Sequence, residues 1–141
     1  MKRGVRLKNQ GLVRVGTIYL PVVSVDVSAD WYIKNLCAEL SYKDEEKAIL
    51  NVANLSVFLV KSHEDQTANF YDCNGAERFS VTFEVDGLHA LEALHNEYRQ
   101  KGVKVGDIES RGHAGKNFVF YDLDGNLFDV WSELSPSFKE D

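Results

Sequence analysis

Hydrophobic and polar residues alternate with a period of two in two separate segments of the chain. In the first segment, residues 17–25, the side chains of Ile18, Leu20 and Val22 share one face. Residues 80–86, with the sequence SVTFEVD, alternate in the same way. Alternation of this kind predicts strands that bury one face, because successive side chains in a strand point to opposite sides. The two segments therefore predict two related strands that each begin a structural unit.

A helical pattern and then three strand candidates follow each of these leading strands. Ser28 is predicted as the N-cap of the first helix, and the second helix is predicted to begin at Asp86 and to end at Gly102. Pro21 cannot donate a ladder hydrogen bond, so the first leading strand is predicted at a sheet edge or at a bulge. The further strand candidates are residues 38–43, 47–53 and 55–61 in the first half and residues 103–110, 117–121 and 127–133 in the second.

The order of elements is thus βαβββ, twice, with a polar linker at residues 62–78. We predict an α+β fold in which two βαβββ modules form a curled mixed sheet around a cleft. One helix covers only one face of each sheet, so the second faces are free to line a concave ligand site. The predicted units are a basic N-terminal extension at 1–15, a single domain at 16–134 with modules at about 16–62 and 78–134, and a tail at 135–141.

The segment at residues 117–133 contains the most unusual residue of the chain. Asp124 and Gly125 separate two apolar runs, which is a strong signal for a tight hairpin turn. Asp129 stands inside the second run, where a carboxylate is a poor strand former and costly to bury. If its neighbours in the strand pack on the helix, Asp129 and Trp131 face the cleft. The residue is then a metal ligand, a substrate contact or an ordinary acid satisfied by a neighbouring hydroxyl.

Composition and charge narrow the possible partners. The chain has 141 residues and a net charge of −6, which argues against a nucleic acid as the main partner. No apolar run approaches the ~20 residues that span a membrane. Cys37 and Cys73 form neither a disulfide framework nor a metal-ligand spacing, so we predict reduced thiols in a cytoplasmic protein. The basic residues of 1–15 are read either as a solvated terminus or as an arm for an acidic partner.

His113 lies in a glycine-containing loop between Gly112 and Gly115. Such loops often carry function, so His113 is a candidate acid–base group or ligand contact, with a solvated histidine as the alternative. Arg111 and Lys116 flank it and form a small basic cluster, which is either an anion contact or a soluble part of the loop.

Three segments resemble the vicinal oxygen chelate superfamily, which includes glyoxalase I, extradiol dioxygenases, and bleomycin- and fosfomycin-resistance proteins. They are TIYLPVVS with the following SADWYIKNL, then SVTFEVD, and finally FYDLDGNLFDV. The last is similar to the family ending F-x-D-P-D-G-N-x-x-E-L, with Leu123 in place of proline and Asp129 in place of glutamate. The resemblance covers roughly residues 16–134 and implies the paired βαβββ fold. It also implies a homodimer, because related proteins often dimerise.

The resemblance further implies four metal-ligand positions, which fall on Thr17, Ser80, a residue near Phe58, and Asp129. Only Asp129 is a good ligand, whereas a divalent cation normally takes three or more ligands from histidine, carboxylate or thiolate. We therefore predict that the usual metal site is absent and that no cofactor is needed. The alternative is a metal held by non-standard ligands, for which His113 or Glu84 would have to join Asp129.

The sequence thus predicts a metal-independent protein that binds a small organic molecule in its cleft. The alternatives are a metal-dependent lyase, isomerase or dioxygenase of the same family, and an interaction module that uses the basic first fifteen residues. Asp129 and His113 are the candidates for a catalytic role. The predicted ligand-binding residues are Thr17, Tyr19, Phe58, Ser80, Thr82, His113, Asp129 and Trp131.

Overall fold

A computed structural model describes residues 11–139, so most of the predicted basic extension lies outside the described residues. The first half of the chain forms β1 (Thr17–Val22), α2 (Val25–Leu36), β2 (Glu39–Lys43), β3 (Lys47–Val52) and β4 (Leu55–Lys61). The connecting segment contains β5 (Phe70–Tyr71) and β6 (Glu77–Arg78), and the second half forms β7 (Thr82–Glu84), α3 (Leu88–Lys101), β8 (Asn117–Tyr121), β9 (Leu127–Trp131) and α4 (Pro136–Lys139). None of the helices between residues 11 and 139 is long and apolar enough to cross a bilayer.

The strands form two related sheets. The first has the order β1-β4-β3-β2, and the second has the order β7-β9-β8. In each sheet the leading strand pairs in parallel with the last strand of its own half, β1 with β4 and β7 with β9. β1 is an edge strand, which is where Pro21 was predicted to place it. The prediction of two related α+β modules is therefore confirmed.

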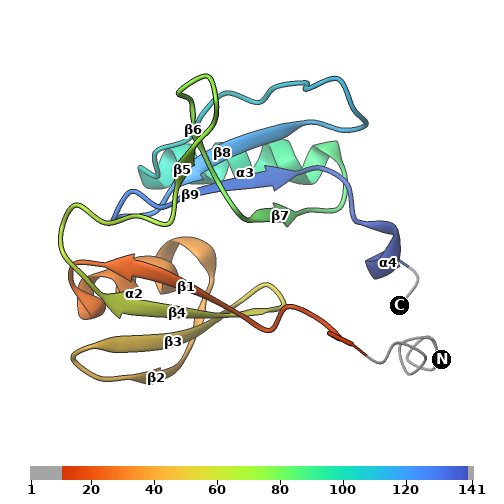
Figure 1. The fold of residues 1–141 in the computed structure, drawn as a ribbon. Coiled ribbons are helices and arrows are strands. Elements are labelled where there is room, and N and C mark those ends of the chain that lie inside the picture. Colours follow the sequence, from red (N-terminus) through yellow and green to blue (C-terminus); the bar gives the residue numbers. More distant parts are fainter. Residues whose placement is uncertain (1–10, 140–141) are drawn as a thin grey trace.

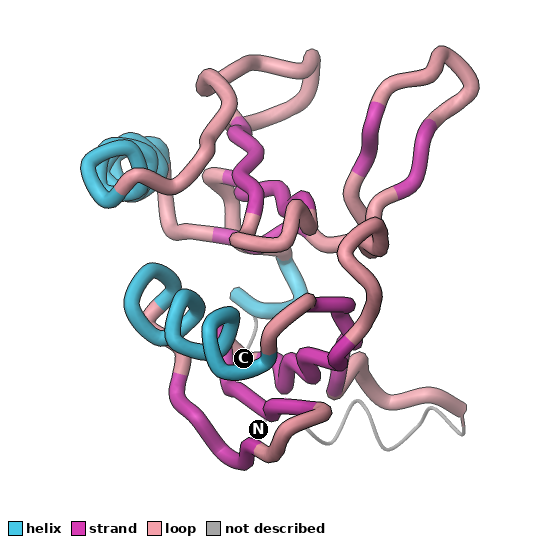
Figure 2. The backbone as a smooth tube through the Cα atoms, turned by 90° about the vertical axis from the view of Figure 1, so that its left-hand side faces the viewer, coloured by secondary structure: helices cyan, strands magenta, loops and turns pink. Residues whose placement is uncertain are grey.

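The two longer helices, α2 and α3, lie on the same side of the two sheets. In Figure 1 the edge strands β1 and β7 face each other, and α2 and α3 lie behind the strands. Figure 2 shows the same arrangement from the side, with the helices on the left and the β5–β6 hairpin projecting on the opposite side. The sheets together form a curled, unclosed surface, which is free of helices on the face toward the viewer in Figure 1. We call this face the helix-free surface.

The core lies between the helices and the sheet faces that the helices cover, on the other side of the sheets from the helix-free surface. Leu20, Val22 and Leu50 of the first sheet are buried in it, as are Phe118 and Val130 of the second. These residues belong to one continuous cluster that includes both modules. Buried residues of both modules therefore contribute to one core.

A loop at residues 122–126 joins the second module to the first. The buried carboxylate of Asp122 accepts hydrogen bonds from the hydroxyl of Tyr32 and from the side chain and backbone N–H of Asn126. Asp124 accepts from the Ser28 hydroxyl and from the backbone N–H of Val23. The side-chain amide of Asn126 also donates to the carbonyl of Pro21, 3.0 Å away. The DGN segment that predicted a hairpin therefore also holds the two modules together.

Two predicted helix caps are wrong. Ser24 caps α2 instead of Ser28, and its side chain accepts from the N–H of Val27. Ser28 is buried within the first turns of the helix, and its hydroxyl donates a hydrogen bond to Asp124. α3 begins after Gly87, so Asp86 makes no cap, whereas the predicted end at Gly102 is confirmed by its left-handed conformation.

The strand predicted at residues 103–110 is not formed. Only two isolated bridges join this segment to β8, Val105 to Phe120 and Glu109 to Asn117. Between them, the carbonyl of Gly106 lies 2.8 Å from Nε2 of His95 on α3, which diverts it from a sheet partner. The hairpin predicted around Asp124 and Gly125 is confirmed, because β8 and β9 pair antiparallel on either side of residues 122–126. Asp122 accepts the N–H groups of Asp124 and Asn126, which widens the connection.

The Asp122 junction predicts a specific dependence of stability on pH. Burial raises the pKa of Asp122 from its ordinary value of 3.8, although hydrogen bonds from Tyr32 and Asn126 act in the opposite direction. The stabilisation due to a raised folded-state pKa is fully present below the unfolded value and is lost as the pH rises through the folded value. The difference in unfolding free energy between the wild type and Asp122→Ala is therefore expected to be larger near pH 4 than at pH 7. Urea unfolding at both pH values measures it, and a difference that grows toward pH 7 would contradict this expectation.

Candidate functional site

An aromatic row crosses the helix-free surface of the first sheet. Tyr19 pairs in register with Phe58, Phe58 with Ile49, and Ile49 with Tyr42, so the row runs across all the strands of this sheet. The rings of Tyr19 and Phe58 are 4.9 Å apart. Tyr19 is 64% exposed, so its ring is accessible from solvent. This row can contact an apolar or aromatic ligand. Thr17 lies on the same surface and pairs with Ser56.

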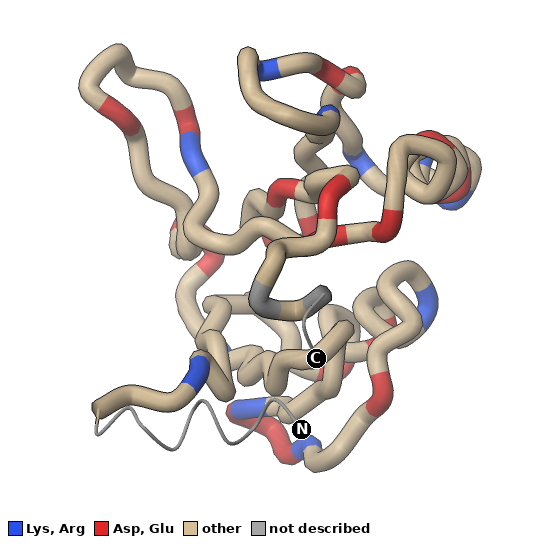
Figure 3. Tube along the Cα trace, turned by 90° about the vertical axis from the view of Figure 1, so that its right-hand side faces the viewer, with Lys and Arg blue, Asp and Glu red and all other residues tan. Residues whose placement is uncertain are grey.

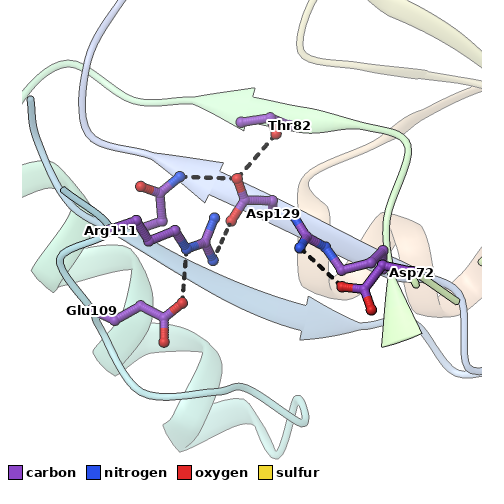
Figure 4. A network of polar contacts seen from close by, with 7 residues as sticks. Asp72, Thr82, Glu109, Arg111 and Asp129 are labelled. Carbon is purple, nitrogen blue, oxygen red and sulfur yellow. Dashed lines mark hydrogen bonds and ion pairs between the residues drawn. The ribbon is translucent and has the colours of Figure 1, made fainter. Parts of the chain in front are cut away.

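The second sheet carries a buried acid at the corresponding position. Asp129 pairs in register with Thr82, as Phe58 pairs with Tyr19, and it is only 2% exposed. Its Oδ2 accepts hydrogen bonds from the Thr82 hydroxyl at 3.0 Å and from the side-chain amide of Asn117 at 2.9 Å. Figure 4 shows Asp129 and Thr82 in this network. The carboxylate is thus covered by side chains of the two neighbouring strands and is not exposed to solvent.

Arg111 provides the positive charge for this acid. Its Nη2 lies 3.1 Å from Oδ1 of Asp129, and its Nε donates to Glu109 at 2.7 Å (Figure 4). Burial alone would lower the pKa of Arg111, but the contacts with Glu109 and Asp129 outweigh burial and raise it. Arg111 therefore stays charged and is held between two carboxylates.

The loop that carries Arg111 is held against β9 by several contacts. The ring of His113 lies edge-on to Trp131 at 5.7 Å, and Nε1 of Trp131 donates to the carbonyl of Ala114 at 2.8 Å. Gly115 has a φ of +76°, and a Cβ at this position would lie 2.6 Å from the Ser132 hydroxyl. Only glycine fits such a close approach in this conformation. The loop consequently has a defined place over the end of β9.

The structure brings some of the predicted residues together and separates others. Thr82 contacts Asp129, and His113 contacts Trp131, whereas no hydrogen bond joins the two pairs among residues 11–139. Ser80 is exposed and precedes β7, so Thr82 is the hydroxyl of this strand that reaches Asp129.

Asn117 and Glu109 were not among the predicted site residues, and no contact between Arg111 and Asp129 was predicted. Asn117 has the strand parity of Val119, which pairs with Asp129, so the period of two could have placed it on the same face. The sequence carries no comparable signal for Arg111, because the loop brings it back from outside the strands.

The described residues do not fit a divalent metal at this place. Between residues 11 and 139, no group of three or more histidine, cysteine, aspartate or glutamate side chains could hold a metal ion. The carboxylate of Glu84 accepts from the backbone N–H and the hydroxyl of Ser135. Nδ1 of His113 lies 2.8 Å from the carbonyl of Ala114. Neither of the two alternative ligands therefore reaches Asp129.

A cavity of about 450 Å³ lies at the seam between the two sheets. It is formed by the β3–β4 turn, by β7 and by the C-terminal segment. Thr82 lines it and also contacts Asp129, so the cavity and the buried acid share one wall. The residues that line it are Ala53, Asn54, Leu55, Thr82, Phe83, Glu84, Leu134 and Phe138.

Comparison with known proteins gives one family match. The family described as "Glyoxalase/Bleomycin resistance protein/Dioxygenase superfamily" matches residues 14–130. No curated protein matches the sequence.

Several solved structures have a similar fold. One is lactoylglutathione lyase from Agrobacterium tumefaciens, with a TM-score of 0.69 and 13% identity, covering 87% of this chain and 96% of that one. A second is the fosfomycin resistance protein FosX from Listeria monocytogenes, in complex with Mn(II) and sulfate, with a TM-score of 0.67 and 17% identity over 89% and 92% of the two chains. A third is TnmS3, an antibiotic binding protein from a Streptomyces species, with a TM-score of 0.66 and 16% identity over 89% and 100%. At these identities the likeness concerns the fold alone.

Proposed function

Since the chain belongs to the glyoxalase/bleomycin resistance protein/dioxygenase superfamily, we propose that it binds a small organic molecule on its helix-free surface without a divalent metal. The ligand in this proposal is partly apolar. It lies against Tyr19 and Phe58 and reaches the seam lined by Thr82.

The observation that carries this proposal is the set of partners of Asp129. Thr82, Asn117 and Arg111 surround the carboxylate, and the guanidinium already supplies a positive charge. A metal at this acid would have to displace Arg111, and the described residues offer it no further histidine, cysteine or carboxylate cluster. The exposed Tyr19 gives independent support, because aromatic side chains commonly line ligand sites and this ring is accessible on the helix-free surface.

The other predictions about partners remain proposals. Acidic and basic residues are interspersed along both modules in the described part of the chain (Figure 3), which supports a small-molecule ligand rather than a nucleic acid. We propose a cytoplasmic homodimer on the grounds given by the sequence. The basic first residues, on which an interaction module would depend, lie for the most part outside the described residues.

A thermal-shift screen of metabolites and antibiotics tests the proposed function. A ligand that binds the native state raises the apparent melting temperature by mass action. We expect at least one compound to do so, and we expect Tyr19→Ala to weaken its binding by about tenfold, the effect of losing roughly 1.4 kcal/mol of contact. Ile33→Ala is the control, because Ile33 is a partly exposed apolar residue on α2. Equal weakening by both variants would contradict a site at Tyr19.

Elemental analysis of protein purified without chelator tests the metal-free part of the proposal. We expect less than stoichiometric zinc, nickel, iron and manganese. One equivalent of any of these metals would show that the contact between Arg111 and Asp129 does not replace a metal site.

A further inference from the structure

The guanidinium of Arg111 has more donors than its partners use. Arginine carries five N–H groups and accepts no hydrogen bond. Nε is taken by Glu109, and one side of Nη2 faces Asp129. Among residues 11–139, the remaining N–H groups have no hydrogen-bond partner, and the side chain is 24% exposed. Arg111 is therefore fixed on one edge and can donate from the other.

The charge around Arg111 decides what the free edge can bind. Glu109 and Asp129 together already outweigh the single positive charge of the guanidinium. Arg78, which packs on the same Phe79 ring as Arg111, forms an ion pair with Asp72 at 3.5 Å, so this pair adds no net charge (Figure 4). A carboxylate or phosphate ligand would thus approach an arginine whose charge is already compensated, and it would be repelled by the two acids. A neutral oxygen acceptor gains the hydrogen bond without this repulsion.

The surroundings of Arg111 also fit a planar ligand. The guanidinium carbon lies over the ring of Phe79, 5.7 Å from its centre, and that of Arg78 lies 5.3 Å from the same ring centre, so an aromatic ring borders the site. Asp129, which Arg111 contacts, pairs in register with Thr82 of β7, and β7 is the edge strand of the second sheet on the side of β1, which carries Tyr19 (Figure 1). A ligand with its oxygen at Arg111 can therefore extend over Thr82 toward Tyr19.

We propose that Arg111 determines specificity by donating hydrogen bonds to a neutral carbonyl or phenol oxygen of an aromatic ligand. Asp129 and Glu109 act as positioning residues, because they hold the guanidinium and cancel its attraction for anions. The inference rests on the proposed function, since it concerns the ligand of the same surface.

Three probes with the same ring system test the proposal: 2-acetylnaphthalene, 2-naphthoate and 2-naphthylmethylamine. Their dissociation constants are measured by NMR titration of the full-length protein. We expect the wild type to bind the neutral ketone about tenfold more tightly than either charged probe, a difference of roughly 1.4 kcal/mol. The carboxylate of 2-naphthoate is repelled by Asp129 and Glu109, and the ammonium group of 2-naphthylmethylamine offers Arg111 no acceptor. Arg111→Met is expected to remove this preference, whereas Lys34→Met, an exposed site on α2, is expected to keep it.

A second variant gives a test that does not depend on removing Arg111. Glu109 is exposed, so Glu109→Gln should fold normally while one negative charge is removed from the guanidinium. We expect this variant to bind 2-naphthoate several-fold more tightly than the wild type and to bind the ketone about equally well. An unchanged affinity for naphthoate would overturn the proposal, as would a ketone preference that survives in Arg111→Met.

The outcomes also separate this inference from the proposed function. If all three probes bind equally and Tyr19→Ala weakens them all, the surface binds aromatic ligands but Arg111 does not select among them. If no probe binds while the wider screen finds a ligand that depends on Tyr19, the inference fails and the proposed function stands. If neither the probes nor the screen gives a ligand, both are wrong.

Discussion

Replacing Asp122 with alanine is expected to lower the free energy of unfolding by about 3–5 kcal/mol, because several buried donors lose their acceptor at once. The hydroxyl of Tyr32, the side-chain amide of Asn126 and the N–H of Asp124 all donate to this carboxylate. Each lies at the junction of the modules, so the loss affects the shared core. For a domain of this size the melting temperature should fall by about 10 °C or more.

Asp30→Ala is the matched control for this variant. Asp30 is an exposed aspartate on α2, two residues from Tyr32, and exposed substitutions usually change stability by less than about 0.5 kcal/mol. Chemical denaturation of both variants at one pH gives the comparison. If Asp122→Ala were as stable as Asp30→Ala, the contacts of the 122–126 loop would not hold the modules together.

The second large effect is expected for Gly115→Ala, which should cost about 2–4 kcal/mol of stability. The new Cβ would lie 2.6 Å from the Ser132 hydroxyl and 2.9 Å from Nε1 of Trp131, at a φ of +76°. Relief of these contacts must move the loop away from β9. Because the same loop carries Arg111, the variant is also expected to lose the ketone preference of the wild type.

Gly112→Ala separates backbone strain from steric contact in this experiment. Gly112 has a similar φ of +86°, but a Cβ there would meet nothing within 4 Å. It should therefore cost only the roughly 1–2 kcal/mol of a left-handed conformation. Equal losses of stability in the two variants, measured by urea unfolding, would show that the contact with β9 is not tight.

The paired modules could be predicted from the repeated order of strand and helix patterns and from the resemblance to a known family. The alternation in β1 and β7 marked the two leading strands, because burial of one sheet face requires the period of two. The helix caps could not be predicted in the same way. Both Ser24 and Ser28 are good caps by type, and Ser28 is excluded only because its hydroxyl bonds to Asp124, almost a hundred positions away. Residues 103–110 have strand-like residues, but His95 on α3 takes the carbonyl of Gly106. Tertiary contacts therefore decided what local patterns left open.

The residues of the candidate site also differ in how far the sequence could predict them. Asp129 could be placed on the helix-free face because strand parity is a local property. Its pairing with Arg111 depends on the course of a loop of irregular structure, for which the sequence has no period. The sequence left open whether Asp129 is a metal ligand, a substrate contact or a satisfied acid, and the structure adds that Arg111 is its charged partner.

The parallel pairs of the two sheets also have a consequence for folding kinetics. Thr17 pairs with Ser56 and Thr82 pairs with Asp129, so each pairing closes a loop of roughly forty residues or more. The entropy of this loop closure is lost before the contacts between the strands lower the free energy. The β3–β4 hairpin can form early because its strands are adjacent in sequence. The leading strands β1 and β7 must wait for distant partners, and non-local pairing of this kind slows folding. We therefore expect β1 and β7, the strands at the seam, to be the last strands of their sheets to pair during folding.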